Sequence, residues 1–387
     1  MNSRVKVSVL VPIYNVEVFL PECLDSLVGQ TLKEIEIICI NDGSTDASLK
    51  IIKKYAKNDK RIIIIDKKNS GYGDSMNIGL TKAVGEYVGI VESDDYIDLD
   101  AFEKMYKLAK KYDLDVVKSN FYEYVTRKKR DISKSNMFLP DEENIVLNTR
   151  EHRHVFYEQP SIWSAIYRRE FLNNNDVNFL PSPGASYQDA GFNFKVWAAA
   201  KRVMMINRAF LHYRQDNPNS SVKSDGKIYA VKNEYDEVER WLKEHKLYEE
   251  YGPTLVGMRF SSYIWNMRRL TRKAAKEFVG TIRKDMERLK KEGMLDDKKL
   301  DDVSRYNVKQ LSISHPMLYL NMRPLYELRS KTKRGISKTL RILLPKYKQR
   351  LNTIDLINEL INTEEDLERK IDRLEEKIKT LKGDKKK

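Results

Sequence analysis

Short apolar runs alternate with segments of helical spacing along the first 120 residues of this 387-residue chain. Four runs are rich in Val and Ile and have the length of strands: 5–13, 34–42, 61–66 and 86–95. Between them, apolar residues recur at helical spacing in three segments: 16–30, 46–58 and 72–85. Strands of this composition that alternate with helices are typical of a parallel sheet covered on both faces. The pattern therefore predicts an α/β fold with a mostly parallel sheet.

Each predicted strand ends in a polar cluster. The clusters read PIYN (12–15), NDGSTD (41–46), KNSGYG (68–73) and ESDD (92–95). Open α/β sheets bind ligands beyond the carboxyl ends of their strands. We therefore expect these four loops to converge on one ligand-binding crevice.

Beyond residue 120 the pattern changes three times. Scattered aromatic residues mark 121–230, which we expect to pack against the sheet, and 231–322 is helical and lacks evident site chemistry. Residues 323–350 hold ten Lys or Arg and one Glu, which supplies nine of the net charge of +14. This basic tract either lies on an anionic membrane surface or forms a solvated linker helix, and the sequence leaves both open.

The last segment, 351–387, carries an a/d heptad pattern. Glu364 is its one polar seam position, and the apolar positions keep alternating three- and four-residue spacing: Ile357, Leu360, Leu367, Ile371, Leu374, Ile378 and Leu381. The pattern predicts a coiled coil that joins subunits into a homo-oligomer. About three heptads are short, so dimer and trimer both stay open.

Composition narrows the class of protein and its compartment. Only two cysteines occur, Cys23 and Cys39, which suits a reducing cytoplasm and argues against a disulfide scaffold. The chain begins directly with a strand pattern, and no run reaches the roughly 18 apolar residues of a membrane span. We expect a cytoplasmic protein, or one on the inner face of the cell membrane. Nucleic acid is not an expected partner, because the charge excess sits in one tract and no nucleic-acid module is recognisable.

Four polar features allow both a structural and a chemical interpretation. Asp42 either belongs to a turn or accepts a hydrogen bond from a nucleobase. The carboxylates of 92–95 either form a solvated loop or bind a divalent cation, because Mg²⁺ and Mn²⁺ take carboxylates together with substrate phosphates. Asp189, at a predicted helix start, is either a carboxylate favoured by the helix dipole or a general base. His212 is either structural or a metal ligand.

Taken together, the motifs over residues 5–215 resemble family 2 of the glycosyltransferases, which have a GT-A fold. The resemblance rests on six stretches: VSVLVPIYN, INDGSTD, KKNSGYGDSMNIGL, GEYVGIVESDDYID, SIWSAIYRREF and SYQDAGFNFKVW. They look like the bacterial subgroup that builds capsule, lipopolysaccharide or teichoic-acid glycans. The resemblance implies a catalytic domain over 1–230, with a donor-binding half at 1–120 and an acceptor-side half at 121–230.

The resemblance also implies roles for individual residues. Donor binding falls to Pro12, Tyr14, Glu17, Asp42, Asp74, Ser93 and Asp95. Pro12, Tyr14, Glu17 and Asp42 would hold the nucleotide base. Glu92-Ser93-Asp94 occupies the D-x-D position that carries the diphosphate and a divalent metal, Mn²⁺ or Mg²⁺, and His212 completes the metal site. Asp189 matches the catalytic base.

The sequence departs from the family pattern at three of these motifs. Glu92 replaces the first Asp of D-x-D, which leaves Asp94 as the safer metal ligand, and Gln188 replaces the Glu that precedes the catalytic Asp. Ser75-Met76-Asn77 stands where many members have Ala-Arg-Asn, so a donor-side arginine is missing. These departures keep open an alternative, a catalytically degenerate nucleotide-sugar-binding or scaffold protein.

The function implied by the resemblance is an inverting, metal-dependent glycosyl transfer. The donor would be a nucleotide-diphosphate sugar, in the first instance a UDP-sugar. The acceptor would be a hydroxyl of a cell-surface glycan or of a lipid-linked glycan.

Overall fold

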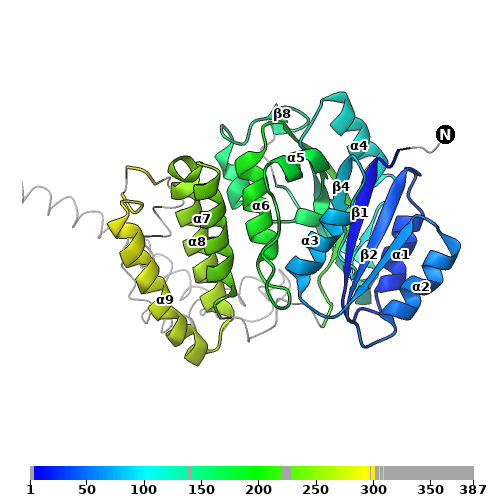
Figure 1. The fold of residues 1–387 in the computed structure, drawn as a ribbon, viewed down its shortest axis with the longest axis horizontal. Helices are drawn as coiled ribbons and strands as arrows, with labels where there is room; N and C mark the ends of the chain where they lie inside the picture. Colours follow the sequence, from blue (N-terminus) through cyan, green and yellow to red (C-terminus); the bar gives the residue numbers. More distant parts are fainter. Residues whose placement is uncertain are drawn as a thin grey trace, which may run out of the picture. The chain divides into compact units, whose positions relative to one another are not determined.

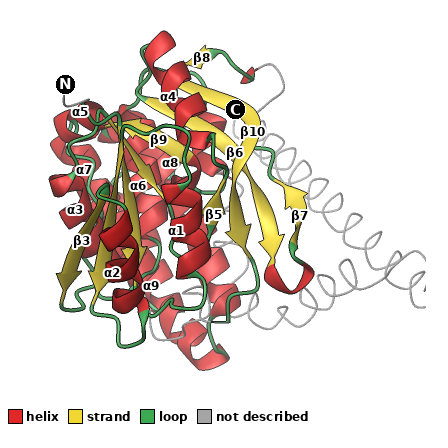
Figure 2. Ribbon diagram, turned by 90° about the vertical axis from the view of Figure 1, so that its right-hand side faces the viewer, coloured by secondary structure: helices red, strands yellow, loops and turns green. Residues whose placement is uncertain are grey.

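One mixed sheet forms the centre of the structure. The computed structural model describes residues 4–137, 142–218, 228–296 and 298–300 together with Arg305 and Val308, all within a compact unit of residues 1–320. The strands of these residues are β1 (Val7–Ile13), β2 (Ile35–Asp42), β3 (Ile62–Lys67), β4 (Tyr87–Ile90), β5 (Tyr96–Ile97), β6 (Val116–Val125), β7 (Arg130–Lys134), β8 (Val146–Leu147), β9 (Ala165–Arg168) and β10 (Val203–Arg214). They pair in the order β3-β2-β1-β4-β9-β6-β10-β5, with β7 on β6 and β8 on β10 (Figure 2).

The helices alternate with the strands at first and then follow one another. They are α1 (Leu20–Val28), α2 (Ser48–Asn58), α3 (Tyr72–Lys82), α4 (Ala101–Lys111), α5 (Arg169–Asn174), α6 (Gln188–Ala199), α7 (Ala230–Glu244), α8 (Tyr248–Arg269) and α9 (Arg272–Lys291), with short 3₁₀ turns η1 (Thr126–Lys128), η3 (Arg153–Tyr157) and η4 (Ile162–Ser164). Helices α1 and α2 cover one face of the first strands and α3 covers the other, and α6 lies on the same side as α3, farther from these strands (Figure 1). Helices α7, α8 and α9 stack beyond α6 (Figure 1).

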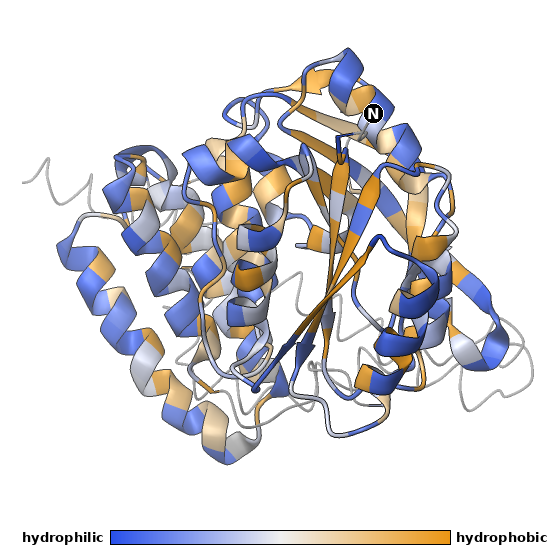
Figure 3. Cartoon of the chain, turned by 45° about the vertical axis from the view of Figure 1, so that its right-hand side comes forward, coloured by the Kyte–Doolittle hydropathy of each residue, from blue (hydrophilic) through white to orange (hydrophobic). Residues whose placement is uncertain are grey.

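The predicted alternation of strands and helices is confirmed for the first four strands. Strands β3, β2, β1 and β4 are parallel neighbours, and every residue of β1 and β2 is buried, as expected for strands covered on both faces. Figure 3 shows apolar colouring along these strands and hydrophilic colouring at their carboxyl ends. The strand expected over 86–95 ends at Ile90, so its carboxylates lie beyond the sheet.

The expectation of a mostly parallel sheet is wrong for the rest of the sheet. Strand β9 runs antiparallel to both β4 and β6, and β5 and β8 run antiparallel to β10. Only the β6–β10 pair is parallel in this half. Apolar runs report burial and length but not strand direction, which is why the sequence pattern did not separate these strands.

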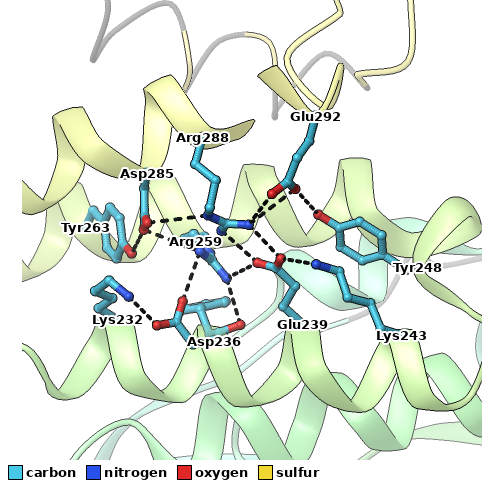
Figure 4. A network of polar contacts seen from close by, with 11 residues as sticks. Lys232, Asp236, Glu239, Lys243, Tyr248, Arg259, Tyr263, Asp285, Arg288 and Glu292 are labelled. Atoms are coloured by element: carbon cyan, nitrogen blue, oxygen red, sulfur yellow. Dashed lines mark hydrogen bonds and ion pairs between the residues drawn. The ribbon is translucent and has the colours of Figure 1, made fainter. Parts of the chain in front are cut away.

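A buried ion network holds the three helices that stack beyond α6. The Arg259 side chain of α8 is fully buried; its Nη2 donates to Glu239 Oε2 of α7 at 2.7 Å, and its Nη1 lies 3.3 Å from Asp285 Oδ2 of α9 (Figure 4). Arg288 of α9 also donates to Glu239, at 2.7 Å. Burial raises the pKa of Glu239, but the hydrogen bond from Arg288 and the charge of Arg259 outweigh it and lower that pKa to about 2. Glu239 therefore stays ionised and paired inside the layer.

Two predicted segments lie outside the described residues: the basic tract 323–350 and the heptad segment 351–387. The last part of the predicted helical region, from residue 309 to 322, lies outside them as well. Among the residues that the structure describes, no helix combines the length and the apolar character needed to cross a bilayer.

Candidate active site

Three carboxylates follow the carboxyl end of β4. Glu92 Oε1 accepts a hydrogen bond from the Tyr72 hydroxyl at 2.7 Å, and Asp94 Oδ2 accepts one from Asn217 Nδ2 at 2.7 Å. Asp95 is buried; its Oδ1 accepts from the Arg214 backbone N–H at 2.8 Å, while its Oδ2 is shielded from solvent and has no hydrogen-bond partner.

The protonation of these groups reflects their crowding. Burial raises the pKa of Glu92 to about 8, and the charges of Asp94 and Asp189 add to that effect. Burial, together with the charge of Asp94, also raises the pKa of Asp95. Because a nearby positive charge favours the ionised form of a carboxylate, a cation bound between these crowded groups would be stabilised.

Arg214, at the end of β10, is the cation that makes this crowding tolerable. Its buried side chain donates from Nε to the Asp94 carbonyl at 2.6 Å and from Nη2 to Glu22 Oε2 at 2.5 Å. Its guanidinium lies over the rings of Phe19 and Tyr124, at 4.7 and 5.1 Å from their centroids. Because Arg214 binds main chain and a side chain of α1, it holds the acidic loop in place, and its charge offsets part of the rise in the pKa of Asp95. No role was predicted for this residue.

Asp189 lies in the first turn of α6, and its charge raises the pKa of Glu92. Its Oδ1 accepts from the Ala190 backbone N–H at 2.9 Å, and burial raises its pKa to about 6. After burial itself, the charges of Asp95, Asp94, Asp189 and Glu92 together raise the pKa of Tyr213, which places Tyr213 within electrostatic range of all four. The fold therefore brings residues that lie almost 100 positions apart in the sequence within electrostatic range of one another.

Gln188 and a loop before α6 position this aspartate. Gln188 Nε2 donates to Ser182 Oγ at 2.8 Å and to the Gly184 carbonyl at 3.3 Å. A glutamate could not donate these bonds, which gives the departure from the family's Glu a structural reason. The amide thus fixes the loop of residues 180–186 that leads to Asp189.

Gly71 and Gly73 allow that loop to reach α3. A Cβ on Gly71 would lie 2.3 Å from the Ser182 carbonyl oxygen, and one on Gly73 would lie 2.0 Å from the Leu180 carbonyl oxygen. Gly71 also has a φ of 99°, a backbone conformation that side chains rarely adopt. The two glycines of KNSGYG therefore mark a close approach of two segments of main chain.

Asp42 and Asp74 meet at Lys67, a cation that the sequence analysis did not single out. Lys67 Nζ bonds Asp42 Oδ1 and lies 3.5 Å from Asp74 Oδ2. Asp42 also accepts from the backbone N–H groups of Ser70 and Gly71, at 2.9 and 3.0 Å. Burial raises the pKa of Asp42, but the hydrogen bonds from Lys67 and Ser70 outweigh it, so the pKa lies below its usual value. Lys67 Nζ also donates to Ser75 Oγ at 3.2 Å, so a positive charge lies next to the motif that lacks its arginine.

The remaining predicted donor residues surround the end of β1. Pro12 is buried within β1 opposite Ile40 of β2, whereas Tyr14 is 54% exposed. Glu17 is exposed, and its Oε2 accepts from the Ala47 backbone N–H at 2.6 Å, just before α2. Tyr14 thus offers an accessible ring beside Asp42's strand, while Glu17 satisfies an amide at a helix start. Ser93 is buried between Glu92 and Asp94.

His212 has both ring nitrogens engaged away from Asp94. Nδ1 lies 2.8 Å from Asp131 Oδ1, and Nε2 lies 3.2 Å from Asp98 Oδ1. The ring stacks on Tyr96, with centroids 4.2 Å apart. Burial lowers the pKa of His212, but the hydrogen bonds to Asp98 and Asp131 outweigh it, so the pKa lies above its usual value. Ligation of a metal by His212 would require one of these two bonds to break.

The donor set after β4 fits a hard divalent cation. Hard cations take oxygen ligands, and Mg²⁺ or Mn²⁺ is usually held by one or two carboxylates plus substrate phosphates. The unpartnered Oδ2 of Asp95 beside Asp94 is an oxygen whose burial without a partner is costly, and a cation would satisfy it. Asp94 and Asp95, with Glu92 behind them, are the residues that would hold the ion.

This fold and this placement of acidic groups are those of a sugar-transferring class of enzyme. Residues 8–175 match glycosyl transferase family 2, and the chain belongs to that family. It is 36% identical over 225 residues to the uncharacterized glycosyltransferase EpsJ of Bacillus subtilis (strain 168), which covers 55% of this chain and 62% of EpsJ. It is 32% identical over 255 residues to the putative glycosyltransferase EpsH of the same strain, which covers 64% of this chain and 72% of EpsH.

A solved structure shares the fold. S. aureus TarS 1-349 in complex with UDP-GlcNAc has a TM-score of 0.52 and 20% sequence identity, and the match covers 79% of this chain and 91% of that one. At this identity the likeness concerns the fold. The match with EpsJ spans 62% of the length of that relative.

Proposed function

We propose that this chain is an inverting, metal-dependent glycosyltransferase that moves a sugar from a UDP-sugar to a hydroxyl of a cell-surface or lipid-linked glycan. The observation that carries the proposal is that buried Asp189, whose pKa is raised to about 6, lies within electrostatic range of Glu92 in the acidic loop after β4. Family membership supports the transfer of a sugar, and the relative with bound UDP-GlcNAc supports a uridine nucleotide.

In this proposal Asp189 acts as the general base. It takes the proton of the acceptor hydroxyl while the hydroxyl oxygen attacks the anomeric carbon, and the bond from that carbon to the diphosphate breaks on the opposite face. A pKa near the working pH suits this role, because the carboxylate is ionised and still basic enough to accept a proton. Inversion of the anomeric configuration follows from the single displacement.

On the donor side, Asp94 and Asp95 hold Mn²⁺ or Mg²⁺, with Glu92 as a third candidate ligand. When bound, the metal offsets the charge that grows on the leaving diphosphate. Asp42 and Tyr14, with Pro12 and Glu17 nearby, contact the nucleotide base, and Asp74 together with Lys67 faces the donor. The half over 1–120 thereby binds the donor, and the half over 121–230 presents the base to the acceptor.

An aromatic group on α8 supports an acceptor position beside Asp189. Trp265 is 42% exposed, and Tyr187, two residues before Asp189, packs edge-on to it with ring centroids 5.6 Å apart. Arg269 lies over the Trp265 ring at 4.3 Å from its centroid. An exposed indole is a suitable surface for a sugar ring, since it combines apolar area with little loss of conformational freedom. We propose that this surface orients the acceptor glycan.

A donor panel tests the proposed function. Binding and hydrolysis of a range of nucleotide sugars are measured with Mn²⁺, with Mg²⁺ or with EDTA, in the wild type and in Asp94→Asn. We expect one donor to bind and turn over with metal, and the variant to lose the metal-dependent part. Silence of a folded protein across the panel would instead favour the degenerate, nucleotide-sugar-binding or scaffold alternative.

Two further proposals concern the segments outside the described residues. We propose that 351–387 joins subunits and that 323–350 contacts an anionic membrane on its cytoplasmic side, where lipid-linked acceptors are embedded. Light scattering after gel filtration, with and without 351–387, tests the first. Sedimentation with anionic and with neutral vesicles tests the second, and equal binding to both would contradict it.

A further inference from the structure

A cluster of two histidines and one glutamate is formed by the connection that follows β7 and precedes β9 in the sequence. Glu142 is 2% exposed, and its two carboxylate oxygens point to different rings: Oε1 lies 2.7 Å from His152 Nδ1, and Oε2 lies 2.9 Å from His154 Nε2. One ligand atom from each residue lies within 4.8 Å of the others. Among the described residues, it is the one group of three or more His, Cys, Asp or Glu side chains with this spacing.

Hydrogen bonding accounts for only part of this geometry. The His152 contact is a hydrogen bond, whereas His154 Nε2 is shielded from solvent and has no hydrogen-bond partner, despite its short distance to Glu142. A buried ring nitrogen that makes no hydrogen bond is costly, even where a carboxylate oxygen lies 2.9 Å away. A metal ion accepts the lone pair of such a nitrogen directly, so an ion between the three groups would account for it.

The cluster is separate from the candidate active site. Glu143, the next residue, pairs with Met205 near the start of β10, whereas Asp95 bonds Arg214 at the end of that strand. Nine residues of strand correspond to roughly 25–30 Å. Thr149, which precedes the histidines, bonds the carbonyl oxygens of Trp197 and Ala200 at the end of α6 opposite to Asp189.

We propose that Glu142, His152 and His154 form a binding site for a transition-metal ion of the zinc type. Two imidazoles and one carboxylate are a ligand set that Zn²⁺ takes, with a fourth position left for water or another oxygen. Zinc bonds of about 2.0–2.2 Å keep tetrahedral ligand atoms roughly 3.3 Å apart, so the three side chains need only small rotations. The histidine side chains are about one-third exposed (31% and 32%), which leaves the ion a way in.

The ion would tie the segment at Glu142 to η3, which Arg153 in turn fastens to the Glu250 carbonyl of α8 at 3.0 Å. This site fixes a long irregular connection and does not depend on the proposed transferase function.

Cobalt and zinc titrations of the full chain, freed of metal by a chelator, test the proposal. Co²⁺ in a tetrahedral site absorbs visible light strongly, while octahedral carboxylate sites absorb weakly, so the spectrum separates this site from the one after β4. We expect one equivalent of strongly absorbing Co²⁺, displaced by Zn²⁺, and a rise in Tm with Zn²⁺. The same result is expected for Asp94→Asn, which alters the other site.

Variants identify the ligands. His152→Gln with His154→Gln, and separately Glu142→Gln, should each lower the Zn²⁺ affinity more than about 100-fold, the upper range for loss of an outer-shell partner. His245→Gln, which alters a partly exposed histidine beside Asp176, should keep it. Circular dichroism checks that each variant folds. If the double histidine variant does not fold, Glu142→Gln still tests the site. No strong Co²⁺ spectrum in the wild type, or unchanged affinity in a folded ligand variant, would overturn the proposal.

Discussion

The pH dependence of turnover follows from the raised pKa of Asp189. If Asp189 is the general base, only its ionised form works, and protonation below a pKa of about 6 switches it off. Above that pKa the carboxylate is free to accept the acceptor's proton. The acidic limb of the rate profile should therefore lie about two pH units above that of an ordinary aspartate.

The size of the effect can be worked out from the pKa. With a pKa of about 6, roughly 97% of Asp189 is ionised at pH 7.5 and roughly 9% at pH 5, so kcat/KM should fall about elevenfold. With the usual value of 3.8, roughly 94% would remain ionised at pH 5 and the rate would hardly change.

The assay is the initial rate of transfer at limiting acceptor and saturating donor and metal between pH 5 and 8. Asp189→Asn should be about 10²–10⁴-fold slower with little change in donor affinity, because it cannot take the proton. Asp176→Asn makes the same chemical change at an exposed position beside His245 and should behave as the wild type. A flat profile down to pH 5, or normal turnover of Asp189→Asn, would refute the assignment of the base.

The other predictions concern packing, the ion network and the acceptor. Gly73→Ala should cost about 1–3 kcal/mol in urea unfolding, because its Cβ meets a loop carbonyl, whereas Gly280→Ala, with no atom near its Cβ, should stabilise by about 0.5–1 kcal/mol. Arg259→Met should lower the free energy of unfolding by about 3–5 kcal/mol, because it leaves buried carboxylates without their cation. Arg240→Met, at an exposed position, should lower it by less than about 1 kcal/mol, and equal losses would contradict the role of the network. Trp265→Ala should raise the acceptor KM and leave donor hydrolysis unchanged; an unchanged KM would remove the acceptor surface from α8.

The sequence predicted those parts of the fold that depend on local pattern. The strands β1 to β4 and the helices between them follow from apolar period and length, and their buried positions agree. The antiparallel insertion of β9 between β4 and β6 depends on which strands pair across long loops, and no local period encodes that. For the same reason the pattern could not distinguish a parallel sheet from a mixed one.

The site divides in a similar way. Carboxylates at a strand end were visible in the sequence, whereas their electrostatic proximity to Asp189 became visible only in the structure. No role was predicted for Lys67 or Arg214, because a single lysine or arginine carries no pattern. Their roles arise from partners that are distant in sequence, such as Glu22 for Arg214. The partners of His212 could not be read from the sequence. Asp98 and Asp131 reach its ring only because β10 pairs with β5 and β7 lies close by.

The contact of Gly71 and Gly73 with the loop of residues 180–186 bears on how such a chain can be recombined. Because two backbones meet there without room for a side chain, the start of α3 is shaped to the main chain of the loop before α6. A chimera that exchanges only the first 120 residues would join surfaces that were never matched. Exchange of a segment that runs from the start of the chain through Asp189 keeps both sides of the contact from one parent. We would therefore place the junction of a chimera after Asp189 when donor preference is to be altered.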